Sequence, residues 1–122
     1  MANPNISAAT SIVAGFAYGI MADTNNNEVL ENAASSGTVI KLNSIVIANV
    51  DGTNSATVSV TISDASGGSD VHLGYLIAVP PKTNLVLVSA DMRIYLLENK
   101  AINLQASAAN DLSYAISYEV IS

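Results

Sequence analysis

The sequence predicts an all-β protein: an antiparallel β-sandwich of jelly-roll type with eight or nine strands and at most one short helix. The first observation is a series of short apolar runs in which apolar and polar residues alternate. The second is that Gly, Asn, Asp and Ser clusters separate these runs, roughly every ten residues, as in sandwiches and barrels. The third is that no helical segments alternate with the strands, so a parallel, doubly wound sheet is not expected.

The chain begins with a small, polar segment. Residues 1–9 contain Pro4, and this composition is typical of a flexible N-terminal arm. We expect a single β-sandwich domain over residues 10–122. The apolar stretch Ile6–Ala22 has no leucine and no Lys or Arg before it, and Ser, Thr and Gly interrupt it. It therefore resembles neither a signal peptide nor a membrane span, and we expect strand structure there.

Two segments near the N-terminus are less regular. Residues 11–22 predict the first strand region, with an interruption near Gly15 or Gly19, because glycine weakens a strand. Residues 28–34 follow a cap-like asparagine, which favours a short helix. The run is too short for a stable isolated helix, so helix and strand both remain open.

The clearest strands lie in the middle of the chain. Val39–Val50 is a long Ile- and Val-rich run, which predicts burial on both faces or a bend near Asn43. Asp51–Asn54 predicts a hairpin turn, because Asp-Gly suits the positive φ angles of such turns. Residues 56–63 alternate, which predicts that Val58, Val60 and Ile62 face the core and that Thr57, Ser59 and Thr61 face water or a neighbour.

The second half of the sequence continues in the same way. Pro80-Pro81 ends one strand, because proline cannot donate to a ladder, and Glu98-Asn99 is a predicted turn. In the last run the apolar and aromatic side chains share one face. The predicted strands are 71–79, 85–89, 93–97, 101–106 and 112–121.

The composition points to contacts with other chains. Only 11% of the 122 residues are charged, against about 25% in a typical domain, and the mean hydropathy is +0.40. A free monomer usually keeps a well-charged surface, so we expect another copy or another protein to cover part of this one. The alternative is a monomer with a Ser, Thr and Asn surface. The absence of cysteine excludes disulfides and fits synthesis in a reducing cytoplasm.

The charge distribution excludes two classes of partner. The net charge is −6, and the four basic residues, Lys41, Lys82, Arg93 and Lys100, are scattered along the chain. A nucleic-acid-binding protein needs a basic patch to neutralise phosphates, and a protein that binds anionic membranes needs a polybasic segment. We expect neither nucleic acid nor a membrane as partner.

No pattern of catalytic or metal-ligating residues is present, so we expect a non-enzyme without a cofactor. His72 is the single histidine, there is no cysteine, and no serine lies in a nucleophile elbow. Asp64–Asp70 is rich in oxygen atoms but lacks the Asp/Asn spacing and closing Glu of a helix-loop-helix calcium loop. A flexible loop is expected there, with calcium binding left open. Glu28, Glu31 and Glu119 are too sparse to single out a catalytic pair.

Carbohydrate binding is the main rival function. Sugar-binding sandwiches usually present aromatic faces, and this chain has five Tyr, one Phe and no Trp. Tyr114 and Tyr118 share a face with apolar neighbours, which favours core packing for both. Tyr18, Tyr75 and Tyr95 lie in predicted strands and leave an aromatic platform open.

Several short stretches carry a resemblance over residues 38–122. They are Val39–Ile45 leading to Ala48-Asn49, the alternating Thr57–Ile62, Val79-Pro80 ahead of Leu85–Leu87, Tyr95–Glu98 and Ser117–Ser122. In these features the chain resembles small virion proteins of tailed bacteriophages, especially those that infect cyanobacteria (cyanophages). Such proteins often have Gly after the Glu of the penultimate turn. Here Asn99 stands in that place and also tolerates the turn.

The resemblance implies a virion structural protein, made in the host cytoplasm, and not an enzyme. Such sandwiches are commonly capsid decoration or cement proteins that bind the major capsid protein, often as homotrimers. Related ones occur in necks, tails and fibres, and a carbohydrate- or receptor-binding module is a further alternative. The resemblance has no catalytic or ligand motif, so no functional residues follow from it.

Overall fold

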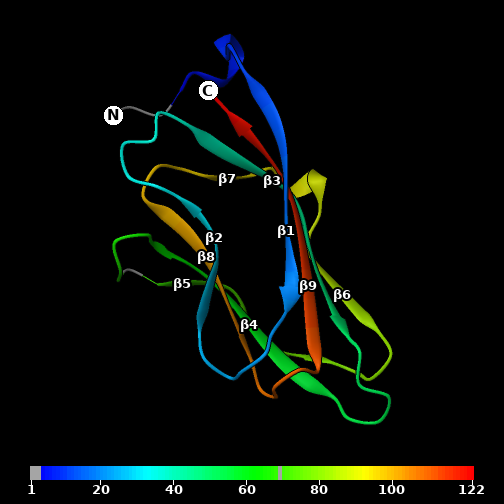
Figure 1. Cartoon of the computed structure of the whole chain (residues 1–122). Helices are drawn as coiled ribbons and strands as arrows, with labels where there is room; N and C mark the ends of the chain where they lie inside the picture. The colour runs from blue at the N-terminus through cyan, green and yellow to red at the C-terminus, as the bar shows by residue number, and fades with distance from the viewer. Residues whose placement is uncertain (1–3, 69) are drawn as a thin grey trace.

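The computed structural model describes residues 4–68 and 70–122 as two antiparallel sheets packed against each other (Figure 1). In these residues the regular elements are nine strands and two three-residue 3-10 turns, and no helix is long and apolar enough to cross a membrane. The strands are β1 (Ile12–Ile20), β2 (Asn27–Asn32), β3 (Val39–Asn49), β4 (Ala56–Asp64), β5 (Val71–Val79), β6 (Asn84–Val88), β7 (Ile94–Leu96), β8 (Lys100–Ala106) and β9 (Leu112–Ile121). The 3-10 turns are η1 (Ile6–Ala8) and η2 (Ala90–Met92).

The strand order confirms the jelly roll. The first sheet has the order β1-β9-β3-β6, with β7 also paired to β3, and the second has the order β2-β8-β4-β5. The chain crosses repeatedly from one sheet to the other, so that strands far apart in sequence become neighbours, as two Greek keys require. The longest regular pairing joins β1 to β9, from Ile12 opposite Ile121 to Ile20 opposite Ser113.

The core lies between the sheets and is filled by the inward-facing side chains of both. Ile45 on β3 and Ile116 on β9 lie opposite each other and are fully buried. Val58 and Val60 of β4 are fully buried from the other side, as their alternation predicts. Each such side chain stabilises the fold by about 1.5–3 kcal/mol relative to exposure. Burial of these alternating positions is therefore what holds the two sheets face to face.

Two buried asparagines join the sheets near the two ends of β3. The Nδ2 group of Asn32, at the end of β2, donates to the carbonyl of Leu96 on β7 at 3.0 Å. The Nδ2 group of Asn49, at the end of β3, donates to the carbonyl of Val79 on β5 at 2.9 Å. Both bonds cross from one sheet to the other, so each asparagine adds a directional contact to a mostly apolar interface.

The structure corrects the prediction for the first strand and decides between helix and strand for the second. β1 runs without a break from Ile12 to Ile20, so the expected interruption near Gly15 or Gly19 is wrong. The rings of Tyr118 and Tyr114 on β9 lie over these two glycines and occupy the space that side chains would need. Residues 27–32 pair with β8 as a strand, so the helix alternative is excluded there.

The predicted hairpin at Asp51–Asn54 is also wrong. β3 and β4 belong to different sheets, so this turn carries the chain across the sandwich. Gly52 is absent from the positions with positive φ, whereas Gly67 and Gly68 have positive φ in the hairpin that joins β4 to β5. The Asp51 carboxylate accepts a bond from the backbone N–H of Thr53 at 3.1 Å, which is ordinary Asx-turn chemistry.

The outward-facing polar residues of β4 are more buried than their alternation suggests. Ser59 and Thr61 are only 7% and 4% exposed. In the ladder Thr61 lies between His72 of β5 and Asn103 of β8. Because β4 is a central strand, longer side chains from both neighbours cover its short ones.

We expect Gly15→Ala to lower the free energy of unfolding by about 1–3 kcal/mol, as overpacking usually does. A Cβ atom at Gly15 would lie 2.2 Å from Cε2 of Tyr118, so the ring must move. Gly19→Ala is the matched control, since its Cβ would lie 3.1 Å from Oη of Tyr114. Urea unfolding of both variants measures the difference, and equal stability losses would contradict the proposed close packing at Gly15.

Candidate functional site

The outer side of the first sheet carries a surface without charged residues, here called the uncharged face. Ile45 and Ile116 point inward, so the residues flanking them in the ladder point outward. Tyr18 and Phe16 are 72% and 58% exposed, with ring centroids 5.4 Å apart. The uncharged face consists of Ala14, Phe16, Tyr18 and Ile20 of β1, Ser113, Ala115 and Ser117 of β9, Ser44, Val46 and Ala48 of β3, and Val86 of β6.

The ion pair Lys41–Glu119 marks one border of the uncharged face. Lys41 Nζ and Glu119 Oε1 are 4.0 Å apart. The two residues lie opposite each other on β3 and β9, and their side chains point outward like those of the uncharged face. The first charged residue of the sequence is Asp23, so β1 brings no charge to the face. Exposed hydrophobic side chains gathered on an uncharged surface are typical of sites that contact another protein.

The free edge of β1 adjoins the uncharged face. β1 is the last strand of its sheet and pairs only with β9 among the described residues (Figure 1). Exposed edge strands usually carry lysine, proline or a bulge that blocks pairing with another chain. The stretch Ile12–Ile20 contains no Lys or Pro, and its register is unbroken. Both the edge and the adjoining face are therefore open to contact with another chain.

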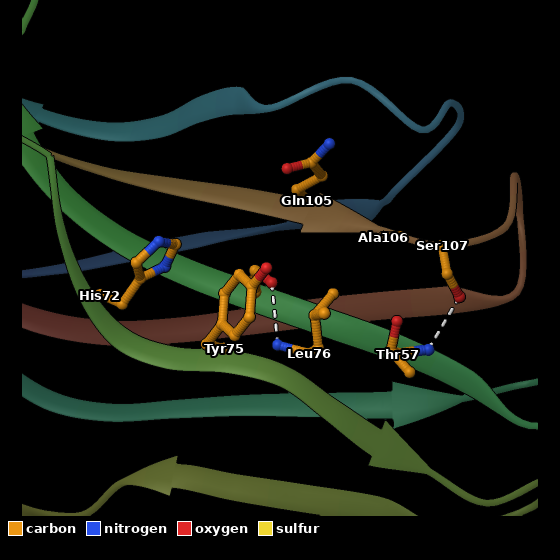
Figure 2. A pocket seen from close by; sticks show the side chains of 8 residues that line it. Thr57, His72, Tyr75, Leu76, Gln105, Ala106 and Ser107 are labelled. Carbon is orange, nitrogen blue, oxygen red and sulfur yellow. Dashed lines mark hydrogen bonds between the residues drawn. The ribbon is translucent and has the colours of Figure 1, made fainter.

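A hollow of about 300 Å³ lies on the outer side of the second sheet. Figure 2 shows its lining, which comes from β4, β5, β8 and the residue after β8. Ser107 Oγ accepts a bond from the N–H of Thr57 at 2.8 Å, which joins the two strand ends beside the hollow. The lining residues are Thr57, Ser59, His72, Tyr75, Leu76, Gln105, Ala106 and Ser107.

The ring of His72 meets that of Tyr75 edge to face, with centroids 4.8 Å apart. Both side chains are exposed on β5, so the single histidine lies at the surface as expected. Sequence reasoning did not bring His72 and Tyr75 together, because they are three residues apart and a regular strand would place them on opposite faces. A bulge in β5 shifts the alternation, so that both side chains lie on the same face.

The tyrosines do not form one platform. Tyr114 and Tyr118 pack against the core, which confirms the sequence prediction for them. Tyr18 and Tyr75 are exposed on different sheets, and Tyr95 is half-buried on β7. Only Tyr75 lines the hollow.

The acidic residues serve mainly as turn and pairing groups. The carboxylate of Asp64 pairs with the ammonium of Lys100. Ser69, in the oxygen-rich loop Asp64–Asp70, lies outside the described residues. Hydrogen bonds lower two carboxyl pKa values, that of Asp23 mainly through the Asn27 side chain and that of Asp51 mainly through the N–H of Thr53. Within residues 4–68 and 70–122, no group of three or more His, Cys, Asp or Glu residues is arranged to hold a metal ion.

One pair of acids was missed by sequence reasoning. A register shift between Glu28 and Leu30 alters the alternation of β2, so Glu28 and Glu31 interact although they are three residues apart. Desolvation, followed by the repulsion of Glu31, raises the pKa of Glu28. Neither acid lines the hollow.

The molecule thus offers two surfaces for binding on different sheets: the uncharged face with its open edge, and the hollow. Comparison with known proteins does not choose between them, since no family model matches the chain and no curated protein is significantly similar to it.

Proposed function

We propose that this protein is a virion structural protein, a capsid decoration protein that self-associates as a homotrimer and binds the shell of the major capsid protein. The observation that carries the proposal is the uncharged face with the open edge of β1. The resemblance of residues 38–122 to phage virion proteins is the basis for assigning the protein to a phage particle and for expecting a homotrimer. We take the protein to be no enzyme and to need no cofactor.

The occupant of the uncharged face is a second copy of the chain. Each copy carries a net charge of −6, so two copies repel each other unless they meet where acids are absent. The uncharged face meets this condition, and it presents Phe16, Tyr18 and Ile20 for burial. Aromatic side chains contribute heavily to interface energy because each buries about 150–250 Å².

Binding to the capsid shell follows from the oligomer. A protein that binds several shell subunits favours the assembled state by linkage. Three linked copies also convert weak single contacts into strong overall binding. The arm of residues 1–9, whose described part contains η1, extends this contact along a neighbouring subunit in the proposed arrangement.

The test is the copy number of the protein in purified virions, followed by heating of particles that lack it. Hundreds of copies and a lower bursting temperature without the protein are expected for decoration, since the shell then loses its linkage stabilisation. A few to some dozens of copies would instead assign the protein to the neck, tail or fibres. An unchanged bursting temperature would overturn the decoration role. Deleting residues 1–9 tests the arm separately.

A further inference from the structure

The strand β5 has an irregular backbone beside the hollow. Val58 pairs with Ile77 and Val60 pairs with Gly74, so Tyr75 and Leu76 together lie opposite the single residue Ser59. This two-against-one arrangement is a β-bulge, which re-aims side chains. As a result two consecutive large side chains, 64% and 56% exposed, both line the same outer surface.

The bulge places a leucine in an unfavourable conformation. Leu76 has φ of +48°, in the left-handed region that branched, bulky side chains avoid. Its N–H donates to Ser59 Oγ at 3.0 Å, which holds the bulge in place (Figure 2). Glycine would adopt this backbone without strain. Strained residues of this kind concentrate at ligand sites, so the strained backbone at Leu76 supports a binding role for this surface.

The lining of the hollow is uncharged, and it combines an apolar surface with several hydrogen-bonding groups. Six of its eight residues carry a hydroxyl, amide, phenol or imidazole, and none is Asp, Glu, Lys or Arg. Ser107 Oγ accepts from Thr57, which leaves its own proton free to donate. Gln105 donates to the carbonyl of Thr24 at 3.2 Å through Nε2, and its exposed Oε1 can accept. The hollow therefore suits a neutral ligand that both donates and accepts hydrogen bonds.

We propose that the hollow binds one pyranose ring of a neutral glycan. The Tyr75 ring and the Leu76 side chain contact the C–H face of the sugar, while Gln105 and Ser107 bond its hydroxyl groups. Few convergent polar groups beside an aromatic surface are typical of small-ligand sites, and about 300 Å³ lies at the lower end of their range. A purely apolar ligand would leave the hydroxyl and amide groups unpaired.

This inference goes beyond the proposed function and does not depend on it. The hollow lies on the second sheet and the uncharged face lies on the first. A decoration protein with both surfaces could attach to a shell and hold a glycan outside it. Loss of one activity without the other is therefore measurable.

The experiment titrates the full-length, isotope-labelled protein with the methyl glycosides of glucose, galactose, mannose and N-acetylglucosamine. Backbone NMR shifts around Tyr75, Leu76 and Gln105 are expected for at least one glycoside. Tyr75→Ala should weaken that binding by at least about tenfold, since the stacking contact is lost. Leu76→Gly should also weaken it while relieving the strained φ angle, so a binding loss in this variant does not reflect unfolding.

Val50→Ala is the control, because Val50 is 59% exposed and lies outside both the hollow and the uncharged face, so this variant should bind like the wild type. Absence of localised shifts with all four glycosides would overturn the inference. Binding that survives Tyr75→Ala unchanged would overturn it as well. The oligomeric state of each variant, measured in parallel, reports separately on the proposed assembly.

Discussion

Replacing Asn49 with alanine is expected to lower the free energy of unfolding by about 2–4 kcal/mol. Asn49 is 3% exposed, and its Nδ2 group donates to the carbonyls of Asn54 and Val79, both at 2.9 Å. Its Oδ1 atom accepts from the N–H of Asp51 at 2.9 Å. Alanine makes none of these bonds, and a buried polar group left without a partner costs about 1–3 kcal/mol. Urea unfolding at neutral pH measures the change.

Asn84→Ala serves as the control for this prediction, since Asn84 is exposed on β6 and surface substitutions usually change stability by no more than about 0.5 kcal/mol. Asn49→Asp keeps the acceptor but loses both donors and buries a charge, so it should be at least as damaging as alanine at neutral pH. If Asn49→Ala and Asn84→Ala unfolded at the same urea concentration, the asparagine would not join the two sheets as described.

The strands were predictable because their signal is local. β5 and β9 coincide with the predicted runs 71–79 and 112–121, since alternation and flanking turn residues mark both ends. Fold class follows from such runs without knowledge of which strands pair. Tyr114 and Tyr118 were placed in the core for the same reason: their positions alternate with polar ones.

The errors concern relations that only pairing determines. Asp51-Gly52 has the composition of a hairpin turn, yet the strands on either side enter different sheets. Glycine weakens an isolated strand, but the ring of Tyr118 on β9, about a hundred residues later in the sequence, covers Gly15 in the folded protein. Sandwich connections and cross-strand cover depend on contacts distant in sequence, so no local window contains them.

The candidate surfaces were only partly predictable. Low charge predicts a surface covered by another chain, and the pairing of β9 with both β1 and β3 determines where the uncharged side chains gather. The hollow depends on the bulge at Tyr75 and Leu76, and a leucine at positive φ has no signature in sequence. Composition therefore favours a covered surface as an expectation, while the register determines which exposed side chains lie together.

Placing a charge in the uncharged face is expected to abolish self-association. Phe16→Glu puts a carboxylate at the centre of β1, where the side chain is 58% exposed. Its charge adds to the net −6 of each copy and must be desolvated at the interface, which costs several kcal/mol. A loss of only about 2.8 kcal/mol weakens association a hundredfold. Light scattering should show the mass falling from three chains of 12.5 kDa to one.

Val50→Glu is the matched control for Phe16→Glu. Val50 is 59% exposed and lies just after β3, outside the set that forms the uncharged face, so this variant should keep the mass of the wild type. Because both replaced side chains are exposed, each monomer should unfold within about 0.5 kcal/mol of the wild type. Trimers that persist in Phe16→Glu, or dissociate equally in both variants, would exclude the uncharged face as the contact between copies. Loss of the trimer in Phe16→Glu alone would place that contact at β1.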